Sequence, residues 1–275
     1  MKHLPTPLPA AAVLAVLATA CTAAADLSAH TLPGTLPAGG FDYQLGGGYP
    51  PPDGTGIVVR DAADRPEPGL YSVCYVNGFQ TQPGEADRWL DEGLVLLDGA
   101  GEPVADPGWP DEYLLDTSDP AGRERIAHLL TETIAGCADA GFAAVEFDNL
   151  DSFTRSGGAL TAEDNFALAG RLVAIARDHG MPAAQKNTAE ETGRGLAAGF
   201  TFAITESCGA WDECDVYTSA YGADGVLDTE YPDTLEERGT TFVQVCADPD
   251  TPPRTILRDP DLVPEGAAGY VYEAC

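Results

Sequence analysis

The chain has 275 residues, which is enough to bury the core of one large domain or of two small ones. Its 44 acidic and 14 basic residues give a formal net charge of −30 at pH 7. This charge argues against nucleic acid as a partner, because the phosphate backbone would be repelled, and it would attract a cationic partner.

Residues 1–21 are predicted to form a signal peptide, because a positively charged start precedes an apolar run over residues 10–20 that is too short to span a bilayer. The run ends in Ala-Thr-Ala-Cys at residues 18–21, which resembles a bacterial lipoprotein cleavage site with Cys21 as the lipidated residue. Ordinary cleavage near residues 23–25 is the alternative. Both predict export, either as a secreted protein or as one attached to the outside of the membrane through a lipid.

Residues 22–40 contain mostly Ala, Thr, Pro and Gly, and this composition predicts a flexible tether. The folded domain is therefore expected at residues 41–275. Short apolar runs in this domain alternate with longer segments and predict eight β-strands. The predicted strands are Phe41–Leu45, Ile57–Arg60, Tyr71–Val76, Ala143–Asp148, Ala183–Asn187, Phe200–Glu206, Val226–Tyr231 and Thr241–Cys246.

Helices are predicted between the later strands. Pro120–Ala140 has Asp119 as a candidate N-cap, Pro in its first turn and apolar residues at helical spacing. Thr161–His179 has a second apolar face and ends before a glycine. Shorter helices are predicted at Ala189–Ala198 and Thr234–Gly239, and Tyr113–Asp116 is interpreted as a short strand or a loop.

The alternation of strands and helices favours a parallel sheet of the α/β class. Eight strands in residues 41–275 fit a single (β/α)₈ TIM barrel, and a doubly wound open sheet is the second interpretation. No Gly-x-Gly-x-x-Gly motif connects a strand to a helix, as a dinucleotide-binding site would require.

Cysteine content agrees with export. Without Cys21, six cysteines remain, and an even number in an exported chain predicts three disulfides. Six cysteines allow 15 connectivities, so the count does not choose among them. No Cys or His spacing is typical of a zinc site.

Polar residues recur where the predicted strands end, and a barrel would bring these ends to one face. Lys186 is unusual among them, because the only other lysine, Lys2, lies in the predicted signal peptide. A lysine close to several carboxylates would keep them ionised. The residues concerned are Asp42, Tyr43, Gln44, Tyr75, Asn77, Glu146, Asp148, Asn149, Asp151, Gln185, Lys186, Asn187, Thr205, Glu206, Ser207, Glu230 and Tyr231.

The cluster of carboxylates after the fourth predicted strand supports two chemistries. A pair of carboxylates can hydrolyse a glycosidic bond, with one protonating the leaving oxygen and the other attacking the sugar or activating water. Alternatively, Glu146, Asp148 and Asp151 could bind a hard cation, although their spacing lacks the EF-hand pattern. No Gly-x-Ser-x-Gly motif is present, and the histidines lie outside the strand ends, so a Ser/His triad is disfavoured.

Several motifs, in the same order, resemble the endo-alpha-1,4-polygalactosaminidases, glycoside hydrolase family 114. The family signature Glu-Pro-Asp-Asn-x-Asp is similar to residues 146–151, with Phe147 in place of Pro. The family's Lys-Asn strand end, its segment with Glu and two cysteines, and its Val-Glu-Tyr are similar to residues 186–187, 205–214 and 229–231. The resemblance extends over residues 41–275 and implies a TIM barrel.

The resemblance implies roles for individual residues. Asp148 is expected to be the nucleophile or base and Glu206 the general acid, with the reverse assignment possible. The resemblance further implies the disulfides Cys74–Cys137, Cys208–Cys214 and Cys246–Cys275. Residues expected to bind the sugar are Gln44, Tyr75, Asp116, Glu146, Asn149, Asp151, Lys186, Asn187, Glu230 and Tyr231.

The implied activity is endo-hydrolysis of α-1,4 bonds in a galactosamine-containing polysaccharide, which is cationic where it is deacetylated, by a monomer without a metal or cofactor. Attraction to such a polymer would explain the net charge. Two alternatives remain at this stage: a barrel that binds polysaccharide without cleaving it, and a metal-dependent hydrolase that uses the acidic cluster.

Overall fold

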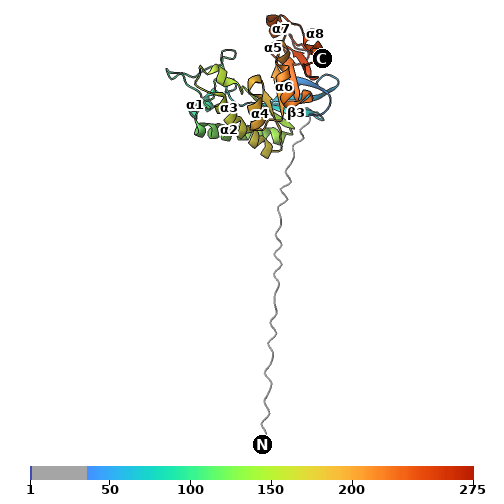
Figure 1. The fold of residues 1–275 in the computed structure, drawn as a ribbon. Coiled ribbons are helices and arrows are strands. Elements are labelled where there is room, and N and C mark those ends of the chain that lie inside the picture. The colour runs from blue at the N-terminus through green and yellow to red at the C-terminus, as the bar shows by residue number, and fades with distance from the viewer. Residues whose placement is uncertain (2–35) are drawn as a thin grey trace. The chain divides into compact units, whose positions relative to one another are not determined.

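The computed structural model describes Met1 and residues 36–275 (Figure 1). The predicted signal peptide, Cys21 and most of the predicted tether lie outside the described residues. The last part of that tether contacts the folded domain, because Arg254 donates hydrogen bonds to the carbonyl oxygens of Pro37 and Gly39 at 2.7 and 3.1 Å. No helix among the described residues has the length and hydrophobicity needed to cross a membrane.

One sheet of nine strands forms the centre of the domain, and its strands follow one another in chain order. Strands β1 to β8 pair in parallel, and β9 pairs antiparallel with β8. This order confirms the barrel and excludes the doubly wound sheet, in which the order reverses at a switch point. The strands are β1 Gly40–Gln44, β2 Thr55–Asp61, β3 Tyr71–Asn77, β4 Ala144–Asp148, β5 Ala183–Lys186, β6 Phe202–Glu206, β7 Val226–Glu230, β8 Thr255–Arg258 and β9 Tyr272–Ala274.

Side chains, rather than a ladder, join β8 and β9 to β1. The fully buried guanidinium of Arg258 donates to the Asp42 carboxylate at 2.9 Å and to the carbonyl oxygen of Tyr43. The hydroxyl of Tyr272 donates to the carbonyl oxygen of Phe41 at 3.0 Å. These bonds give two backbone carbonyl oxygens of β1 partners from β8 and β9.

Helices follow every strand from β3 to β7, whereas loops alone connect β1 to β2 and β2 to β3. The two long helices confirm their predicted boundaries: Asp119 caps α2, Gly141 ends it with a positive φ of 98°, and a capping box starts α3 at Thr161. The elements are α1 Ala86–Asp91, α2 Pro120–Ala140, η1 Ser152–Arg155, α3 Ala162–Asp178, η2 Ala189–Glu191, α4 Thr192–Ala198, α5 Cys208–Trp211, α6 Cys214–Tyr221, η3 Ala223–Gly225, α7 Pro232–Arg238 and α8 Phe242–Ala247.

The strand predicted at Thr241–Cys246 is wrong, because this segment forms helix α8. The hydroxyl of Thr241 accepts a hydrogen bond from the backbone of Gln244 and caps the helix. The sequence predicted a strand because the run is short, apolar and contains β-branched residues, a pattern that also fits a buried helix. The eighth strand is Thr255–Arg258 instead. The segment Tyr113–Asp116 forms isolated bridges within the long connection between β3 and β4.

All three disulfides implied by the family resemblance are confirmed. Cys74–Cys137 joins β3 to α2, Cys208–Cys214 closes a short loop after β6, and Cys246–Cys275 ties α8 to the C-terminal residue. Apolar side chains pack on both sides of the strands. One layer fills the inside of the barrel, and the other lies on its outside, where strands β3, β4 and β5 face helices α2 and α3. Figure 1 shows α2, α3 and α4 beside one another on this flank.

Candidate active site

A cavity of about 450 Å³ opens at the carboxyl ends of the strands, where parallel barrels place their functional groups. Its walls come from the ends of β1, β3, β4, β5 and β6, from the loops after β1, β4, β5, β7 and β8, and from the long connection after β3. The lining residues are Tyr43, Leu45, Gly46, Tyr75, Asp106, Gly108, Trp109, Glu112, Asp148, Asn149, Asp151, Arg155, Lys186, Asn187, Glu206, Tyr231, Pro260, Asp261 and Leu262.

Strand alternation explains which polar side chains enter the barrel. On β4, Ala144 belongs to the apolar layer inside the barrel, whereas Val145 and Phe147 pack on the helix side. Because side chains alternate with a period of two, Glu146 and Asp148 share the inner side with Ala144. The same reasoning places Lys186 inside, two residues after the interior residue Ala184.

Lys186 is the centre of the site. Its ammonium nitrogen lies 3.0 Å from Glu146 Oε1, 3.3 Å from Asp148 Oδ1 and 3.3 Å from Glu206 Oε2. The lysine side chain is 2% exposed and that of Glu146 is fully buried, so this one ion pair is held away from water. Glu206 is 31% exposed and Asp148 18%, so these two carboxylates face the cavity.

Three tyrosines bind the three carboxylates. Their hydroxyl groups donate to Glu146 Oε1 at 3.0 Å, to Asp148 Oδ2 at 2.5 Å and to Glu206 Oε1 at 2.6 Å; the donors are Tyr43, Tyr75 and Tyr231, respectively. Each carboxylate therefore has a fixed orientation, which is the geometric requirement for acid and nucleophile roles.

The chain turns sharply after each of the three central strands. Asn149, Asn187 and Ser207 follow Asp148, Lys186 and Glu206 directly, and all three have positive φ angles between 45° and 64°. Asn187 also links the strands, because its Oδ1 accepts from the backbone of Glu206 at 2.8 Å and its Nδ2 donates to the Glu206 carboxylate at 3.3 Å. Such strained backbone persists where surrounding contacts fix it, and it is frequent at functional sites.

The surroundings shift the pKa values of Glu146 and Asp148 in opposite directions. Burial raises the pKa of Glu146 to about 7, even though Lys186 opposes this shift. Burial also acts on Asp148, but Lys186 and the hydroxyl of Tyr75 outweigh it, and the pKa of Asp148 is lowered. Burial opposes the charge of Lys186, yet the three carboxylates raise its pKa well above the usual value. Asp148 and Lys186 are therefore both charged at neutral pH.

A second cationic side chain holds the outer wall of the cavity. Arg155, from η1, pairs with Asp106 at 2.7 Å and with Asp151 at 2.8 Å, and it donates to Asn149 Oδ1 at 3.0 Å. The long connection after β3 is thus fastened to the loop after β4, which carries Asp148.

Two cationic side chains of the protein, Lys186 and Arg155, line this acidic site. Glu146 and Asp148 both pair with Lys186, and Asp151 pairs with Arg155. The three carboxylates considered for a hard cation therefore already have side-chain cations as partners, and this arrangement does not fit the metal-dependent hydrolase.

Comparisons with known proteins agree with this geometry. The family model for glycoside hydrolase family GH114 matches residues 20–275. The chain belongs to family GH114. No curated protein matches it.

Solved structures with the same fold include Ega3 from Aspergillus fumigatus, crystallised with galactosamine, with a TM-score of 0.68 and 19% identity over 87% of this chain and 96% of that one. The glycoside hydrolase domain of PelA from Pseudomonas aeruginosa has a TM-score of 0.56 and 15% identity over 84% of this chain and 99% of that one. This GH114 chain is a glycoside hydrolase.

Four of the residues expected to bind sugar, Gln44, Asp116, Glu146 and Glu230, do not line the GH114 cavity. Gln44 is buried and binds Asp42 and Arg60. The carboxylate of Asp116 accepts from Ser118, and that of Glu230 accepts from the backbone at the start of α5. Glu146 is fully buried and pairs with Lys186. The other six expected sugar-binding residues and both expected catalytic residues line the cavity: Tyr75, Asn149, Asp151, Lys186, Asn187, Tyr231, Asp148 and Glu206.

The departure from the GH114 motif at Phe147 lies away from the cavity. Its ring is fully buried among the apolar side chains between the strands and the helices. The same strand nevertheless directs Glu146 and Asp148 to Lys186. The substitution therefore changes the packing on the helix side and leaves the arrangement of the carboxylates in place.

Among the lining residues that the sequence did not identify are Asp106, Trp109, Glu112 and Arg155. Three of them lie in the long connection between β3 and β4, in the segment from α1 to α2, which has isolated bridges but no helix or strand. The unusual length of this connection was an available signal, because long loops without secondary structure are often functional. Its fold back over the cavity depends on long-range bridges such as Gln80–Leu114, which no local pattern encodes.

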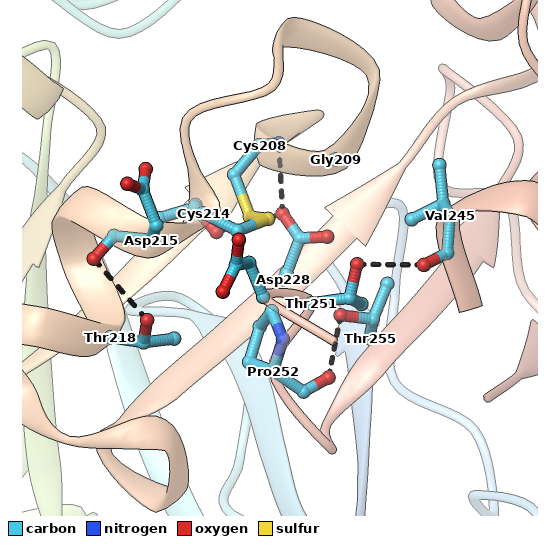
Figure 2. The surroundings of a disulfide bond; sticks show 12 residues. Cys208, Gly209, Cys214, Asp215, Thr218, Asp228, Val245, Thr251, Pro252 and Thr255 are labelled. Carbon is cyan, nitrogen blue, oxygen red and sulfur yellow. Dashed lines mark hydrogen bonds between the residues drawn. A yellow bond between two sulfur atoms is a disulfide. The ribbon is translucent and has the colours of Figure 1, made fainter. Parts of the chain in front are cut away.

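Two buried acids, Asp228 and Glu230, lie together behind the GH114 site. Figure 2 shows the Asp228 carboxylate beside the Cys208–Cys214 disulfide, where it accepts from the backbone of Cys208 at 3.1 Å. One oxygen of each carboxylate has no hydrogen-bond partner among the described residues. Burial, and then the charge of Glu230, raises the pKa of Asp228 well above its usual value, and burial also raises the pKa of Glu230. The raised pKa values favour retention of a proton by this pair, and such a proton would supply the missing donor.

This pair predicts a specific pH dependence of stability. Because folding raises both pKa values, these two groups hold more protons in the folded state than in the unfolded state above about pH 4, and the stability that they contribute falls as pH rises. Asp228→Asn removes one of the two acids, so its stability should fall less between pH 4 and pH 8. Urea unfolding of both proteins across this range measures the effect, and identical slopes would contradict it.

Proposed function

We propose that this protein is an exported endo-glycosidase that hydrolyses α-1,4 bonds in a galactosamine-containing polysaccharide, with Asp148 and Glu206 as its catalytic residues. One observation carries the proposal: both carboxylates face the cavity, from different strands, while sharing the ammonium of Lys186. Two fixed carboxylates on either side of a cavity are the arrangement that glycoside hydrolysis requires.

Asp148 is proposed as the nucleophile. Its lowered pKa keeps it ionised, and Tyr75 and Lys186 fix its two oxygens. In the first step an Asp148 oxygen forms a bond to the anomeric carbon while Glu206 gives its proton to the departing glycosidic oxygen. In the second step Glu206 takes a proton from water, the water oxygen bonds to the anomeric carbon, and the bond to Asp148 breaks.

The distance between the two carboxylates bears on whether Asp148 attacks the sugar directly or activates a water molecule. Asp148 Oδ1 and Glu206 Oε2 both lie 3.3 Å from Lys186 Nζ, so these two oxygens are no further apart than twice that distance. Retaining glycosidases hold their carboxyl groups about 5–5.5 Å apart, and inverting ones about 6.5–9.5 Å. The shared lysine therefore keeps this gap at or below the short end of the inverting range and is compatible with a retaining mechanism with a covalent intermediate, which we propose.

The substrate class is supported by charge. The cavity is lined by six carboxylates and two cationic side chains, and the whole chain carries a net charge of −30. A polymer with free amino groups would be attracted to this surface. The presence of galactosamine in the crystals of Ega3, which has the same fold, points to the same sugar.

Export is supported by the three disulfides, because such bonds persist in oxidising compartments and are rare in the cytoplasm. The polymer would then be met outside the cell. Lipid attachment through Cys21 is proposed as one way of holding the enzyme at the surface.

The test is the release of reducing ends from partly deacetylated poly-α-1,4-galactosamine, together with the length of the remaining polymer. We expect the wild-type protein to release reducing ends with an early drop in polymer length, which is the signature of internal cleavage. Glu206→Gln should lose this activity while Glu236→Gln, the same change on the exposed surface of α7, should keep it.

Two results would contradict the proposal. A folded wild-type protein that binds the polymer without releasing reducing ends would be a binding barrel. Full activity in Glu206→Gln would exclude Glu206 as the general acid.

A further inference from the structure

We propose that Glu112 binds the ammonium group of an amino sugar in a subsite on the Asp148 side of the cavity, with Trp109 as the aromatic surface of that subsite. This inference rests on the proposed function and extends it: Glu112 would determine the preference for deacetylated over acetylated sugar. Neither residue belongs to the carboxylate cluster around Lys186.

The position of Glu112 is fixed by the strands that carry the site. Its Oε2 accepts a hydrogen bond from Asn77 Nδ2 at 3.0 Å. Asn77, at the end of β3, is the register partner of Asp148 on β4, and its Oδ1 accepts from Asn149 Nδ2 at 3.1 Å. Glu112 is therefore one hydrogen bond away from the strand ends that position the proposed nucleophile.

The backbone around Glu112 is also held. Its amide donates to the carbonyl oxygen of Trp109 at 2.9 Å, and its own carbonyl oxygen accepts from Asp106 at 2.9 Å. The Asp106 carboxylate accepts from the amides of Gly108 and Trp109 at 2.8 and 3.2 Å, and it pairs with Arg155. The turn that presents Trp109 and Glu112 is thus anchored before any ligand binds, which reduces the entropic cost of binding.

Charge distinguishes Glu112 from the other carboxylates of the cavity. Lys186 pairs with Asp148 and Glu206, and Arg155 pairs with Asp106 and Asp151. Among residues 36–275, Glu112 forms no ion pair, and its side-chain partner is the neutral amide of Asn77.

Asp261 also lacks an ion pair among the described residues, but it is exposed at the rim, where water can solvate it. Glu112 is half-buried, and burial raises its pKa to about 7. A cation that entered the cavity beside Glu112 would therefore gain a partner that the protein itself does not neutralise.

An amino sugar offers such a cation, and its N-acetylated form does not. An acetamido group placed against Glu112 would bury the carboxylate without a charge partner, and sites built for a polar group reject ligands that leave it unpaired. Trp109 would supply apolar contact that does not depend on acetylation. Its side chain lines the cavity and is 60% exposed, so its ring is free to stack on a sugar face.

The test compares two oligomers in binding experiments, so that it does not depend on turnover. Galactosamine tetramer and its fully N-acetylated form are titrated calorimetrically into Glu206→Gln, which keeps the ligand intact, and into the double variant Glu206→Gln/Glu112→Gln. We expect Glu112→Gln to weaken binding of the amino tetramer about 10- to 100-fold and to leave the acetylated tetramer within about threefold. The glutamine side chain introduced by this substitution can still accept from Asn77, so the fold should be kept.

Two further variants separate the roles. Glu206→Gln/Glu236→Gln is the matched control and should bind both oligomers as the parent does. Trp109→Ala in the same background should weaken both oligomers to a similar extent. An equal loss for both oligomers in the Glu112 variant, or no loss for either, would overturn the role of Glu112 and leave the proposed function standing. If the parent binds neither oligomer, the subsite and the proposed substrate both fall.

Discussion

Replacing Asp148 by Asn is expected to lower the rate of polymer cleavage by at least about a thousandfold while binding of the polymer is kept. The amide cannot attack the anomeric carbon, yet it has nearly the same shape and can still accept the hydrogen bond from Tyr75, which the carboxylate receives at 2.5 Å. The loss should therefore appear in kcat, with KM changed little. Steady-state measurement of reducing ends over a range of polymer concentrations separates the two constants.

Asp139→Asn is the matched control for this variant. Asp139 lies exposed in the last turn of α2 and has no side-chain hydrogen bond with the rest of the described chain, so its replacement should leave kcat and KM unchanged. Asp148→Asn with more than about a tenth of the wild-type kcat would exclude Asp148 as the nucleophile.

Lys186→Met is expected to lower both stability and activity. The single ammonium compensates three carboxylates, one of them fully buried, and removing one partner of a buried ion pair typically costs about 3–5 kcal/mol. Because the pKa of Glu146 is about 7, Glu146 can escape the penalty by taking up a proton at low pH. The loss of stability should therefore be larger at pH 8 than at pH 5, as measured by urea unfolding.

A double variant distinguishes charge from packing. Lys186→Met/Glu146→Gln removes the uncompensated buried charge and should recover part of the stability at pH 8. Its activity should not return, because Asp148 and Glu206 still lack their shared cation. A double variant no more stable than Lys186→Met would show that the lysine acts through its packing alone.

Much of the fold followed from local patterns. Helices α2 and α3 carry their own start and stop signals, such as Asp119 and Gly141, and these signals act within a few residues of each boundary. The error at Thr241–Cys246 arose where a short apolar run fits a strand and a buried helix equally well, and where the cap and the disulfide to the C-terminal residue decide the outcome.

The candidate site was only partly predictable because position at a strand end does not tell which way a side chain points. Tyr231 lines the cavity, whereas its neighbour Glu230 faces α5 and caps its backbone. On β1, Tyr43 likewise lines the cavity, whereas its neighbour Gln44 binds Asp42 and Arg60. A shift of one residue exchanges the two faces of a strand, and both faces of these strands carry polar residues, so hydropathy could not fix the inner face. Glu112 depended on a long-range fold that the sequence pattern does not contain.

The most direct test of the central claim is to trap the covalent intermediate. Glu206→Gln would be mixed with a galactosamine oligosaccharide carrying fluoride at its anomeric carbon, a leaving group that departs without a general acid, and the protein would then be digested and examined by mass spectrometry. We predict one glycosyl group attached to the peptide that contains Asp148, because loss of Glu206 should also slow attack by water. Attachment to a different carboxylate, or hydrolysis of the fluoride with inversion and no attached sugar, would contradict Asp148 as the nucleophile of a retaining pair.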